Sequence, residues 1–269
     1  MDQALVTILV PHYKTLELTK LCLRLLRKHT DLTKARVIVI DNDSQDDSLA
    51  YLRNLKWITL LERKSIPNEG GVSAHSQALD LAMELVTTPY VLSIHTDTLV
   101  KRSDWLEFLL QQIQSKPNIA GVGSWKLEQK STWRRICKQV ERYIQLGLYK
   151  ISGSTQHSLE GIGKNYYYLR SHCALYDMRL LQQHQLHFSD GDKVAGKEMH
   201  RALIENGHEM IFLPSESLIK YLEHINHATT VLNPELSRQK SQDKGLRRIE
   251  KSLLKLNAKA ILNDMTLDS

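Results

Sequence analysis

Cysteine is scarce in this chain of 269 residues. The three cysteines, Cys22, Cys137 and Cys173, lie far apart, and no C-x-x-C pair occurs. The sequence therefore predicts neither a disulfide framework nor a zinc site built from thiolates, and it favours a reducing, intracellular setting. Apolar residues make up 42% of the chain and charged residues 25%. This balance excludes a disordered or collagen-like protein and supplies enough apolar material for a sizeable core.

Long apolar runs are absent as well. No stretch approaches the roughly 20 apolar residues that a membrane-spanning helix needs. The N-terminus leads directly into a strand-like segment, Val6 to Val10, without a basic region or a cleavage site. We therefore expect a cytoplasmic protein with neither a membrane span nor a secretory signal.

Two glycine-rich phosphate-binding motifs are also missing. No G-x-G-x-x-G follows the first predicted strand, and no G-x-x-x-x-G-K-[ST] occurs anywhere in the chain. These absences argue against dinucleotide-dependent oxidoreductases and P-loop nucleoside triphosphatases.

Positive charge is in excess, with a formal net charge of +6. Residues 126–150 hold seven basic side chains against two acidic ones, and residues 235–269 hold eight against five. Neither stretch has the aromatic and glycine spacing of an RNA-binding sheet or a recognisable DNA-reading helix, so we expect no nucleic-acid partner. Solvated helix faces are the favoured interpretation. The second interpretation is peripheral contact with an anionic membrane surface, at the inner face of a membrane.

Short β-branched runs alternate with helical patterns over the first half of the chain. The periodicity predicts strands over residues 6–10, 37–40, 57–62 and 90–94, separated by helices over residues 16–27, 46–55, 72–86 and 104–114. Apolar strands connected by helices indicate an α/β fold with a mostly parallel sheet flanked by helices. In such a fold, ligands bind at the carboxyl ends of the strands.

The predicted strand ends are all polar. The four segments that follow the strands are Pro11 to Tyr13, Asp41 to Ser44, Pro67 to Gly71 and His95 to Thr98. Loops are often polar, but these carry side chains suited to a nucleotide, a diphosphate and a metal ion. A shared crevice is therefore the better interpretation.

The second half follows a different pattern. It predicts a basic helical stretch over residues 133–149, a Gly/Ser-rich loop over 152–163, an aromatic strand over 166–176, a helix over 195–206, a strand over 210–214 and an amphipathic helix over 235–258. Gly207 is a signal for the end of the helix before it. We expect this half to extend the same sheet and the last helix to pack against the body.

Four motifs occur in a fixed order at the strand ends. They are Val10 to Tyr13 (V-P-x-Y), Ile40 to Asp46 (V-D-N-x-S-x-D, with Ile in first place), Asn68 to Ala74 (N-x-G-x-x-x-A), and His95 to Asp97 with Asp104 to Leu106 (D-x-D in part, then D-W-L). This order resembles the family 2 glycosyltransferases with the GT-A fold, over roughly residues 5–232. The resemblance implies a GT-A domain over residues 1–232, with a nucleotide-sugar-binding half over 1–100 and an acceptor half over 101–232. Residues 233–269 would form a basic amphipathic helix.

The resemblance also implies residues that bind a nucleotide-diphosphate sugar. The residues expected to bind this donor are Pro11, His12, Tyr13, Asp41, Asn42, Asn68, Gly70, Gly71 and Thr96. Asp41 would accept hydrogen bonds from the base or the ribose. Gly70 and Gly71 open a helix, where free N–H groups and a close backbone approach suit a nucleotide. A structural interpretation of residues 41–44, an Asx turn with a cap for the next helix, is compatible with this role.

A divalent ion, Mn²⁺ or Mg²⁺, is implied on the diphosphate, because the leaving group's charge must be neutralised. The expected ligands are His95, Asp97 and His224. The sequence departs from the family here, since His95 replaces the first acid of D-x-D, which makes Mg²⁺ less favoured. In the alternative interpretation His95 caps the strand and Asp97 binds alone. One of His224 and His227 is expected to be loop surface.

The resemblance implies an inverting single displacement that needs a carboxylate base. The usual Glu-Asp pair before the G-[YH] turn is missing, and the candidates are Asp192 and Glu198. Asp192 is preferred because it enters the helix, although counting back from Gly207 favours Glu198. A helix cap and a surface ion-pair partner are the respective structural interpretations. Residues 170–172 are expected to bind the acceptor or the leaving diphosphate.

The leading hypothesis is therefore an inverting, metal-assisted glycosyltransferase. It would move a sugar from a nucleotide-diphosphate sugar to a hydroxyl of a glycan, a polysaccharide or a lipid-linked acceptor. A catalytically inactive GT-A module that serves as a binding or scaffold subunit is the alternative, because of the altered H-x-D and the missing Glu-Asp pair. A sugar nucleotidylyltransferase is disfavoured because no G-x-G-T-R-like loop follows the first strand.

Overall fold

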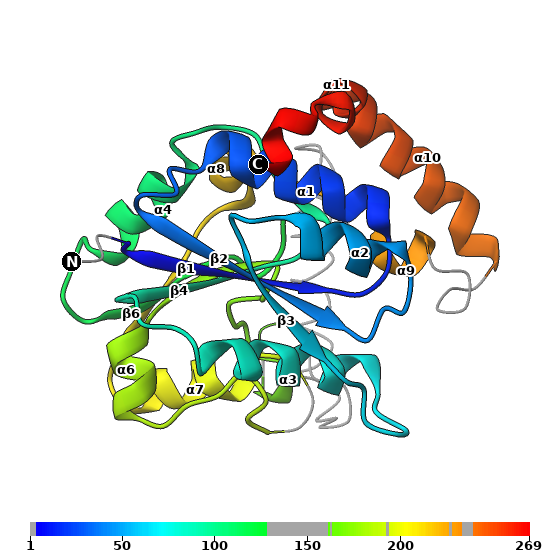
Figure 1. Ribbon diagram of the computed structural model, residues 1–269. Helices are drawn as coiled ribbons and strands as arrows, with labels where there is room; N and C mark the ends of the chain where they lie inside the picture. Colours follow the sequence, from blue (N-terminus) through cyan, green and yellow to red (C-terminus); the bar gives the residue numbers. More distant parts are fainter. Residues whose placement is uncertain (1–3, 128–160, 162, 192–193, 226–227, 233–238) are drawn as a thin grey trace, which may run out of the picture.

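The β-branched segments of the first half form the parallel strands that the sequence predicts. They are β1 (Val6–His12), β2 (Ala35–Asn42), β3 (Thr59–Arg63) and β4 (Tyr90–Ile94). β1 lies between β2 and β4, β2 pairs with β3, and all three pairings are parallel. The computed structural model describes residues 4–127, 161, 163–191, 194–225, 228–232 and 239–269 (Figure 1).

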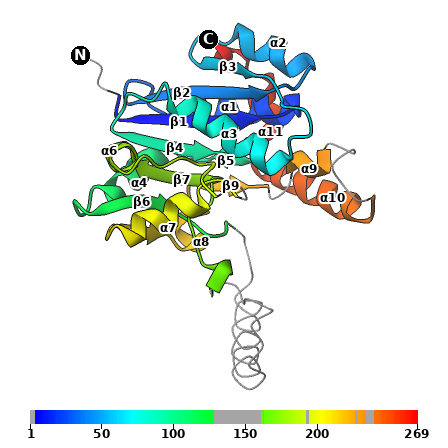
Figure 2. The same ribbon diagram turned by 90° about the horizontal axis from the view of Figure 1, so that it is seen from below.

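The second half extends the same sheet. Its strands are β6 (Ile119–Gly123), β7 (Cys173–Asp177) and β8 (Glu209–Phe212). β7 pairs antiparallel with both β4 and β6, and β8 pairs parallel with β6. The resulting seven-stranded sheet has the order β3-β2-β1-β4-β7-β6-β8. Figure 2 shows the strands from β3 to β6 in this order. The mostly parallel sheet that the sequence predicts is therefore confirmed.

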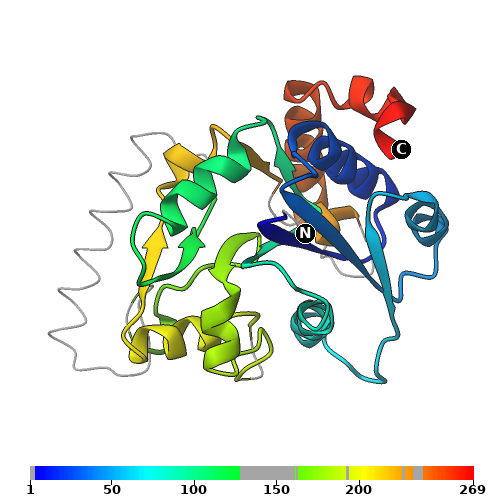
Figure 3. The same ribbon diagram turned by 60° about the vertical axis from the view of Figure 1, so that its left-hand side comes forward.

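Helices cover both faces of the sheet (Figures 1 and 3). On one face lie α1 (Leu16–His29), α2 (Asp47–Asn54) and α4 (Trp105–Ile113), and on the other α3 (Gly71–Met83), α6 (Met178–Gln183) and α7 (Lys197–Glu205). α7 ends as predicted, because Gly207 follows it with a left-handed φ of 84°. Glycine adopts this conformation without the steric penalty that a Cβ brings.

The core follows the alternation of side chains along the central strands. In β1, Ile8 and Val10 face the apolar cluster beneath α1 and α4, whereas Leu9 between them faces the cluster beneath α3, α6 and α7. β2 repeats the pattern, with Val39 in the first cluster and Ile40 in the second. Both faces of these strands are buried, which explains why their sequences are almost continuously apolar.

A second, two-stranded sheet lies beside the end of β4. β5 (Thr98–Val100) pairs antiparallel with β9 (Leu222–His224), and the register sets Thr98 opposite His224. The short helix α8 (Ser215–Leu218) leads into β9 from the region of β8. This pairing returns the chain to the carboxyl end of β4, where the second half of the sequence meets the first.

The predicted aromatic strand over residues 166–176 is too long. Only Cys173–Asp177 forms a strand; residues 166–170 contact other elements through individual side-chain and backbone hydrogen bonds and form no continuous ladder. Tyr166, for example, donates its hydroxyl to Glu198 at 3.2 Å. A helical turn over Gly163–Asn165 precedes this segment. The predicted basic helix over residues 133–149 lies outside the described residues.

The C-terminal segment packs against α1. It consists of α9 (Ala228–Leu232), α10 (Gln239–Lys255), α11 (Ala258–Asn263) and a final 3₁₀ turn (Met265–Asp268). α10 lies within the predicted helix over residues 235–258, and α11 and the final turn are additional elements. Ile249 and Ile261 are buried in the core cluster of α1, whereas Leu254 is exposed. No helix within the described ranges is long and apolar enough to cross a membrane.

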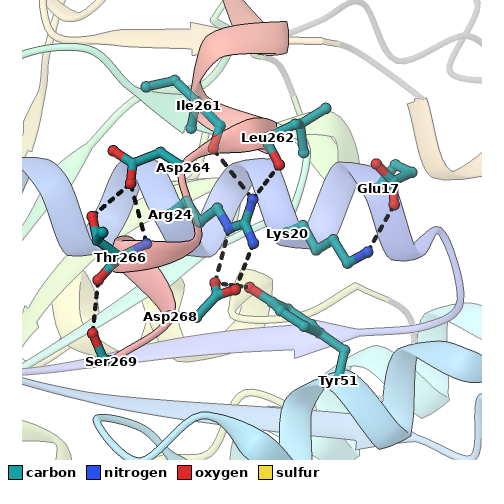
Figure 4. A network of polar contacts seen from close by, with 10 residues as sticks. All are labelled: Glu17, Lys20, Arg24, Tyr51, Ile261, Leu262, Asp264, Thr266, Asp268 and Ser269. Carbon is teal, nitrogen blue, oxygen red and sulfur yellow. Dashed lines mark hydrogen bonds and ion pairs between the residues drawn. The ribbon is translucent and has the colours of Figure 1, made fainter.

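One buried arginine ties the end of the chain to α1 (Figure 4). Arg24 donates from Nε to Asp268 at 2.8 Å, forms an ion pair with it through Nη2, and donates to the carbonyls of Ile261 and Leu262. Tyr51 on α2 also donates to Asp268, at 2.8 Å. The hydrogen bonds from Arg24 lower the pKa of Asp268. The network therefore joins α1, α2 and the C-terminal turn.

We predict that Asp268→Asn lowers the free energy of unfolding by about 2 kcal/mol, because a buried guanidinium loses its charged partner. Since the folded state lowers the pKa of Asp268, this contribution is present above the carboxyl group's unfolded pKa and disappears as the pH falls through the folded pKa. Urea denaturation of both proteins at neutral and acidic pH measures the difference.

The matched control is Glu62→Gln, which alters the exposed, doubly hydrogen-bonded pair of Arg53 and Glu62. Exposed pairs contribute about 0–1 kcal/mol. If Asp268→Asn lowered the free energy of unfolding no more than Glu62→Gln does, the contacts of Arg24 with Asp268 would not stabilise the C-terminal turn.

Candidate functional site

A cleft of about 1220 Å³ opens at the carboxyl ends of β1, β2 and β4. The predicted site residues that line it are Pro11, His12, Tyr13, Asn42, Gly71, His95, Thr96, Asp97 and His224. They share the cleft because parallel strands end at one edge of the sheet. Asp41, Asn68, Gly70 and Glu198 do not line it, and Asp192 lies outside the described residues.

His12 anchors the end of β1. Its ring nitrogens lie 2.8 Å from the Thr19 hydroxyl on α1 and 2.7 Å from the Ser48 hydroxyl on α2. Burial lowers the pKa of His12 to about 4, so the ring is neutral near pH 7. Because both ring nitrogens are hydrogen-bonded, His12 serves to hold the loop that carries Tyr13 in place.

Asp41 sits just beneath the cleft with 2% of its surface exposed. One carboxylate oxygen accepts a hydrogen bond from the Ser44 backbone at 3.2 Å. This bond spans three residues rather than the two of an Asx turn. The following helix is capped by Asp46, which accepts from the Ser48 backbone. The other oxygen of Asp41 is buried and has no hydrogen-bond partner in the described part of the chain.

Asn42 is hydrogen-bonded to Arg63, which itself forms an ion pair with Glu69. The sequence analysis did not predict this ion pair. Its side-chain oxygen accepts from Arg63 at 3.3 Å, and its side-chain nitrogen donates to the Ala74 carbonyl at 3.2 Å. Arg63 in turn forms two hydrogen bonds with Glu69, at 2.6 and 2.9 Å. These bonds lower the pKa of Glu69. Glu69 lies within the Asn68 to Ala74 motif, but nothing in the motif names its partner.

The glycines at the start of α3 leave open space. A Cβ added to Gly70 or Gly71 would meet no atom within 4 Å, so packing within the protein does not require glycine there. α3 begins at Gly71 with Gly70 as its cap residue, and no side chain caps this end. The free N–H groups of the first turn can therefore receive an anion.

The loops around the cleft hold unusual backbone conformations. Several non-glycine residues in the loops after β1, β2 and β3 have a left-handed φ; they are Lys14, Thr15, Asp43, Gln45 and Asn68. The conformation costs energy for residues with a Cβ and is maintained where the surroundings fix it. Asp43, for instance, accepts hydrogen bonds from the backbone and hydroxyl of Ser65 and from Gln45. These hydrogen bonds hold Asp43 in its left-handed conformation at the edge of the cleft.

Asp97 lies at the centre of the cleft with two histidines beside it. Its Oδ1 atom is 3.4 Å from His224 Nε2 and 3.8 Å from His95 Nδ1. One ligand atom from each residue lies within 4.8 Å of the others, a spacing compatible with a shared cation. The pairing of β5 with β9 brings His224 to this position. Burial raises the pKa of Asp97, but His224, His95 and the Ala228 backbone together more than offset this effect, so the pKa lies below its ordinary value.

The donor set fits a transition-metal ion. Asp97 Oδ1 is buried and accepts no hydrogen bond from any described residue, so a carboxylate oxygen is available. Burial, together with His75, lowers the pKa of His95 well below its ordinary value, which leaves the ring neutral and able to donate a lone pair. One carboxylate and two imidazoles are ligands that Mn²⁺, Co²⁺ or Zn²⁺ accepts more readily than Mg²⁺ does.

Two further histidines surround this group. His75 on α3 contacts His95 edge-on, with ring centroids 4.8 Å apart, and His172 stacks on His224 at 4.8 Å. Burial lowers the pKa of His75 to about 4. The sequence interpretation included His172 but missed His75, which directly follows the Asn68 to Ala74 motif. The placement of α3 against the end of β4, which no motif encodes, brings it here.

Basic and aromatic side chains from the second half of the chain also line the cleft. Arg170 and Lys126 line it, and the Arg170 guanidinium lies 4.7 Å from the Trp125 ring centroid and 5.9 Å from that of Tyr168. Arg170 was predicted to lie here, whereas Lys126 was counted only as part of a basic stretch. A cation held over aromatic rings at the cleft suits an anionic group.

Glu198 is engaged away from the cleft. It forms an ion pair with Arg201 at 2.6 Å and accepts a hydrogen bond from Tyr166. This matches the surface-partner interpretation. The loop before α7 is fixed by Asp80 on α3, which accepts from the backbone of Phe188 and Ser189.

The sheet order, the flanking helices and the cleft at the strand ends define an α/β protein of the GT-A type. Residues 7–184 match the family described as glycosyl transferase family 2, and this range is more than half of the chain. The chain therefore belongs to glycosyl transferase family 2. A comparison with curated proteins returned no match.

Solved structures share this fold. One is the mannosyltransferase PcManGT from Pyrobaculum calidifontis, in complex with GDP-Man and Mn²⁺, which is 18% identical with a TM-score of 0.53. The likeness covers 78% of this chain and 54% of that one. Another is S. aureus TarS 1-349, which is 15% identical with a TM-score of 0.52 over 81% of this chain and 59% of that one. The chain thus spans less than two thirds of either structure, and at these identities the likeness concerns the fold.

Proposed function

We propose that the chain is an inverting, metal-assisted glycosyltransferase that moves a sugar from a nucleotide-diphosphate sugar to a hydroxyl of a glycan, polysaccharide or lipid-linked acceptor. The observation that carries the proposal is the group of Asp97, His95 and His224 at the centre of the cleft. It stands at the carboxyl end of β4, where family 2 enzymes carry D-x-D. The solved mannosyltransferase with the same fold contains GDP-Man and Mn²⁺.

The donor would lie across the ends of β1 and β2. One Asp41 oxygen accepts no hydrogen bond from the described residues, so it is an acceptor suited to an N–H group of the base or a ribose hydroxyl. Tyr13 lines the cleft beside it, and His12 and Asn42 hold the surrounding loops. The open start of α3 at Gly71 offers N–H groups to the nucleotide. Asn68, Gly70 and Thr96 remain predicted donor contacts.

Asp97, His95 and His224 would hold the metal ion against the diphosphate. A bound divalent cation supplies charge neutralisation of the leaving nucleoside diphosphate. The chain's own part is to fix the carboxylate and both rings before the donor binds. Arg170 and Lys126 add positive charge on the opposite side of the cleft, where they can contact the departing phosphates or the acceptor.

The acceptor hydroxyl needs a carboxylate base, and we propose Asp192 for this role. Glu198 is engaged by Arg201 and Tyr166, which disfavours it. Val194 and Ala195, which follow shortly after Asp192 in the sequence, line the cleft. A single displacement by the hydroxyl, with its proton passing to Asp192, inverts the anomeric centre.

We predict that Asp97→Ala abolishes Mn²⁺-dependent turnover with an unchanged fold, because the pairing of β5 with β9 and the bond from the Ile225 backbone to the Asp97 carbonyl do not involve the side chain. His95→Asp restores a second carboxylate and is expected to shift the preference towards Mg²⁺. The assay measures hydrolysis or transfer with a panel of uridine, thymidine and guanosine diphosphate sugars. Circular dichroism monitors the fold.

Asp104→Ala, which removes an exposed partner of Arg102 outside the cleft, is the control and should behave like the parent. Full activity of Asp97→Ala in chelator would contradict metal assistance. A parent inactive with every donor and Mn²⁺ would favour the catalytically inactive binding module instead.

The base is tested by two matched amide substitutions. Asp192→Asn should reduce transfer by about two to four orders of magnitude, the usual contribution of a general base, while donor affinity and folding persist. Glu198→Gln should transfer like the parent, since its partners place it on the helix surface. Exchanged outcomes would identify Glu198 as the base, and a product that keeps the donor's anomeric configuration would overturn the inverting mechanism.

A further inference from the structure

One serine hydroxyl contacts two of the cleft histidines. Ser171 Oγ lies 2.9 Å from His95 Nε2 and 3.0 Å from His75 Nε2. The three residues come from separate segments: His75 from α3, His95 from the end of β4, and Ser171 from the turn before β7. Both distances are those of ordinary hydrogen bonds.

A hydroxyl carries a single proton, and this constrains the two rings. Between two imidazole nitrogens, the hydroxyl donates to one and accepts from the other. The ring that receives the serine proton must present a lone pair at Nε2, and the other ring must carry its proton at Nε2. The tautomers of His75 and His95 are therefore complementary, and Ser171 sets the relation between them.

A metal ion bound beside Asp97 would select one of the two arrangements. His95 Nδ1 faces Asp97 Oδ1 at 3.8 Å, and this oxygen has no hydrogen-bond partner among the described residues. A cation shared by the two atoms requires a lone pair at Nδ1, so His95 must carry its proton at Nε2 and donate it to Ser171. The serine proton is then directed to His75 Nε2, and His75 carries its own proton at Nδ1.

We propose that Ser171 is a positioning residue that stabilises His95 in the tautomer able to bind a metal ion through Nδ1, by accepting a hydrogen bond from Nε2. It acts through His95 and need not touch the ion or the substrate. The inference rests on the proposed metal site and adds the residue that prepares it. Outer hydrogen-bond partners of metal-binding histidines fix the tautomer and the ring orientation in just this way.

A direct test reads the tautomers in the parent protein. Two-dimensional ¹⁵N–¹H spectra of the Zn²⁺-loaded, histidine-labelled protein distinguish the two neutral tautomers, and His95→Gln and His75→Gln assign the signals. We expect His95 with its proton at Nε2 and His75 with its proton at Nδ1. The reverse assignment, or the same tautomer for both rings, would overturn the proposal.

A second test measures metal affinity without any turnover. Ser171→Ala should weaken binding of Mn²⁺, followed by the loss of its free electron-paramagnetic-resonance signal, by about 10–100-fold. Ser171→Thr keeps the hydroxyl and should bind like the parent. Ser124→Ala is the matched control, because Ser124 makes the same bond, at 2.9 Å, to His172, which is outside the proposed ligand set.

The outcomes separate the inference from the proposed function. If the parent binds Mn²⁺ and Ser171→Ala binds it equally well, the positioning role is wrong and the metal site stands. An equal loss in Ser124→Ala would also reject a specific role for Ser171. If the parent binds neither Mn²⁺ nor Zn²⁺, the metal-assisted function fails together with the inference. If Ser171→Ala does not fold, the ¹⁵N–¹H spectra of the parent still test the proposal, because they report the tautomers of His75 and His95 directly.

Discussion

The pairing of β5 with β9 is the constraint on which the centre of the cleft depends. It sets Thr98 opposite His224, and a backbone hydrogen bond of 2.8 Å from Ile225 to the Asp97 carbonyl continues the alignment. A residue from the second half of the chain is thereby fixed beside the end of β4 by backbone geometry. The same strand pairing therefore joins the two halves of the chain and brings together the residues of the proposed metal site.

Hydrogen bonding separates the side chains that build the cleft from those that await a ligand. Each nitrogen of His12 and each polar atom of the Asn42 side chain has a partner, so these residues support loops. Asp41 and Asp97 instead each keep a buried carboxylate oxygen that lies near a histidine nitrogen but accepts no well-formed hydrogen bond in the described part of the chain. Leaving such an atom unpaired costs about 1–3 kcal/mol. A donor's N–H or O–H group and a cation would recover that cost, which is why these two residues anchor the proposed function.

The sequence predicted the strand ends well because parallel strands must end at one edge of the sheet. This brought Tyr13, His95 and Asp97 together before any contact was known. It failed where long-range side-chain contacts decide the structure. The partnership of Arg63 with Glu69 joins a strand end to a loop, and the packing of α3 brings His75 to the cleft; neither has a signal in periodicity or spacing. The strand predicted over residues 166–176 was too long for the same reason, because contacts with distant residues hold its first part.

The most direct test of this account is whether a nucleoside diphosphate and Mn²⁺ bind together. Unfolding of the parent would be followed with UDP, GDP and TDP, each with and without the ion. The account predicts that one nucleotide, at a hundred times its dissociation constant, raises the free energy of unfolding by about 2.7 kcal/mol, and that the gain requires Mn²⁺. Absence of stabilisation by every nucleotide in the presence of Mn²⁺ would contradict a nucleotide-sugar site in this cleft.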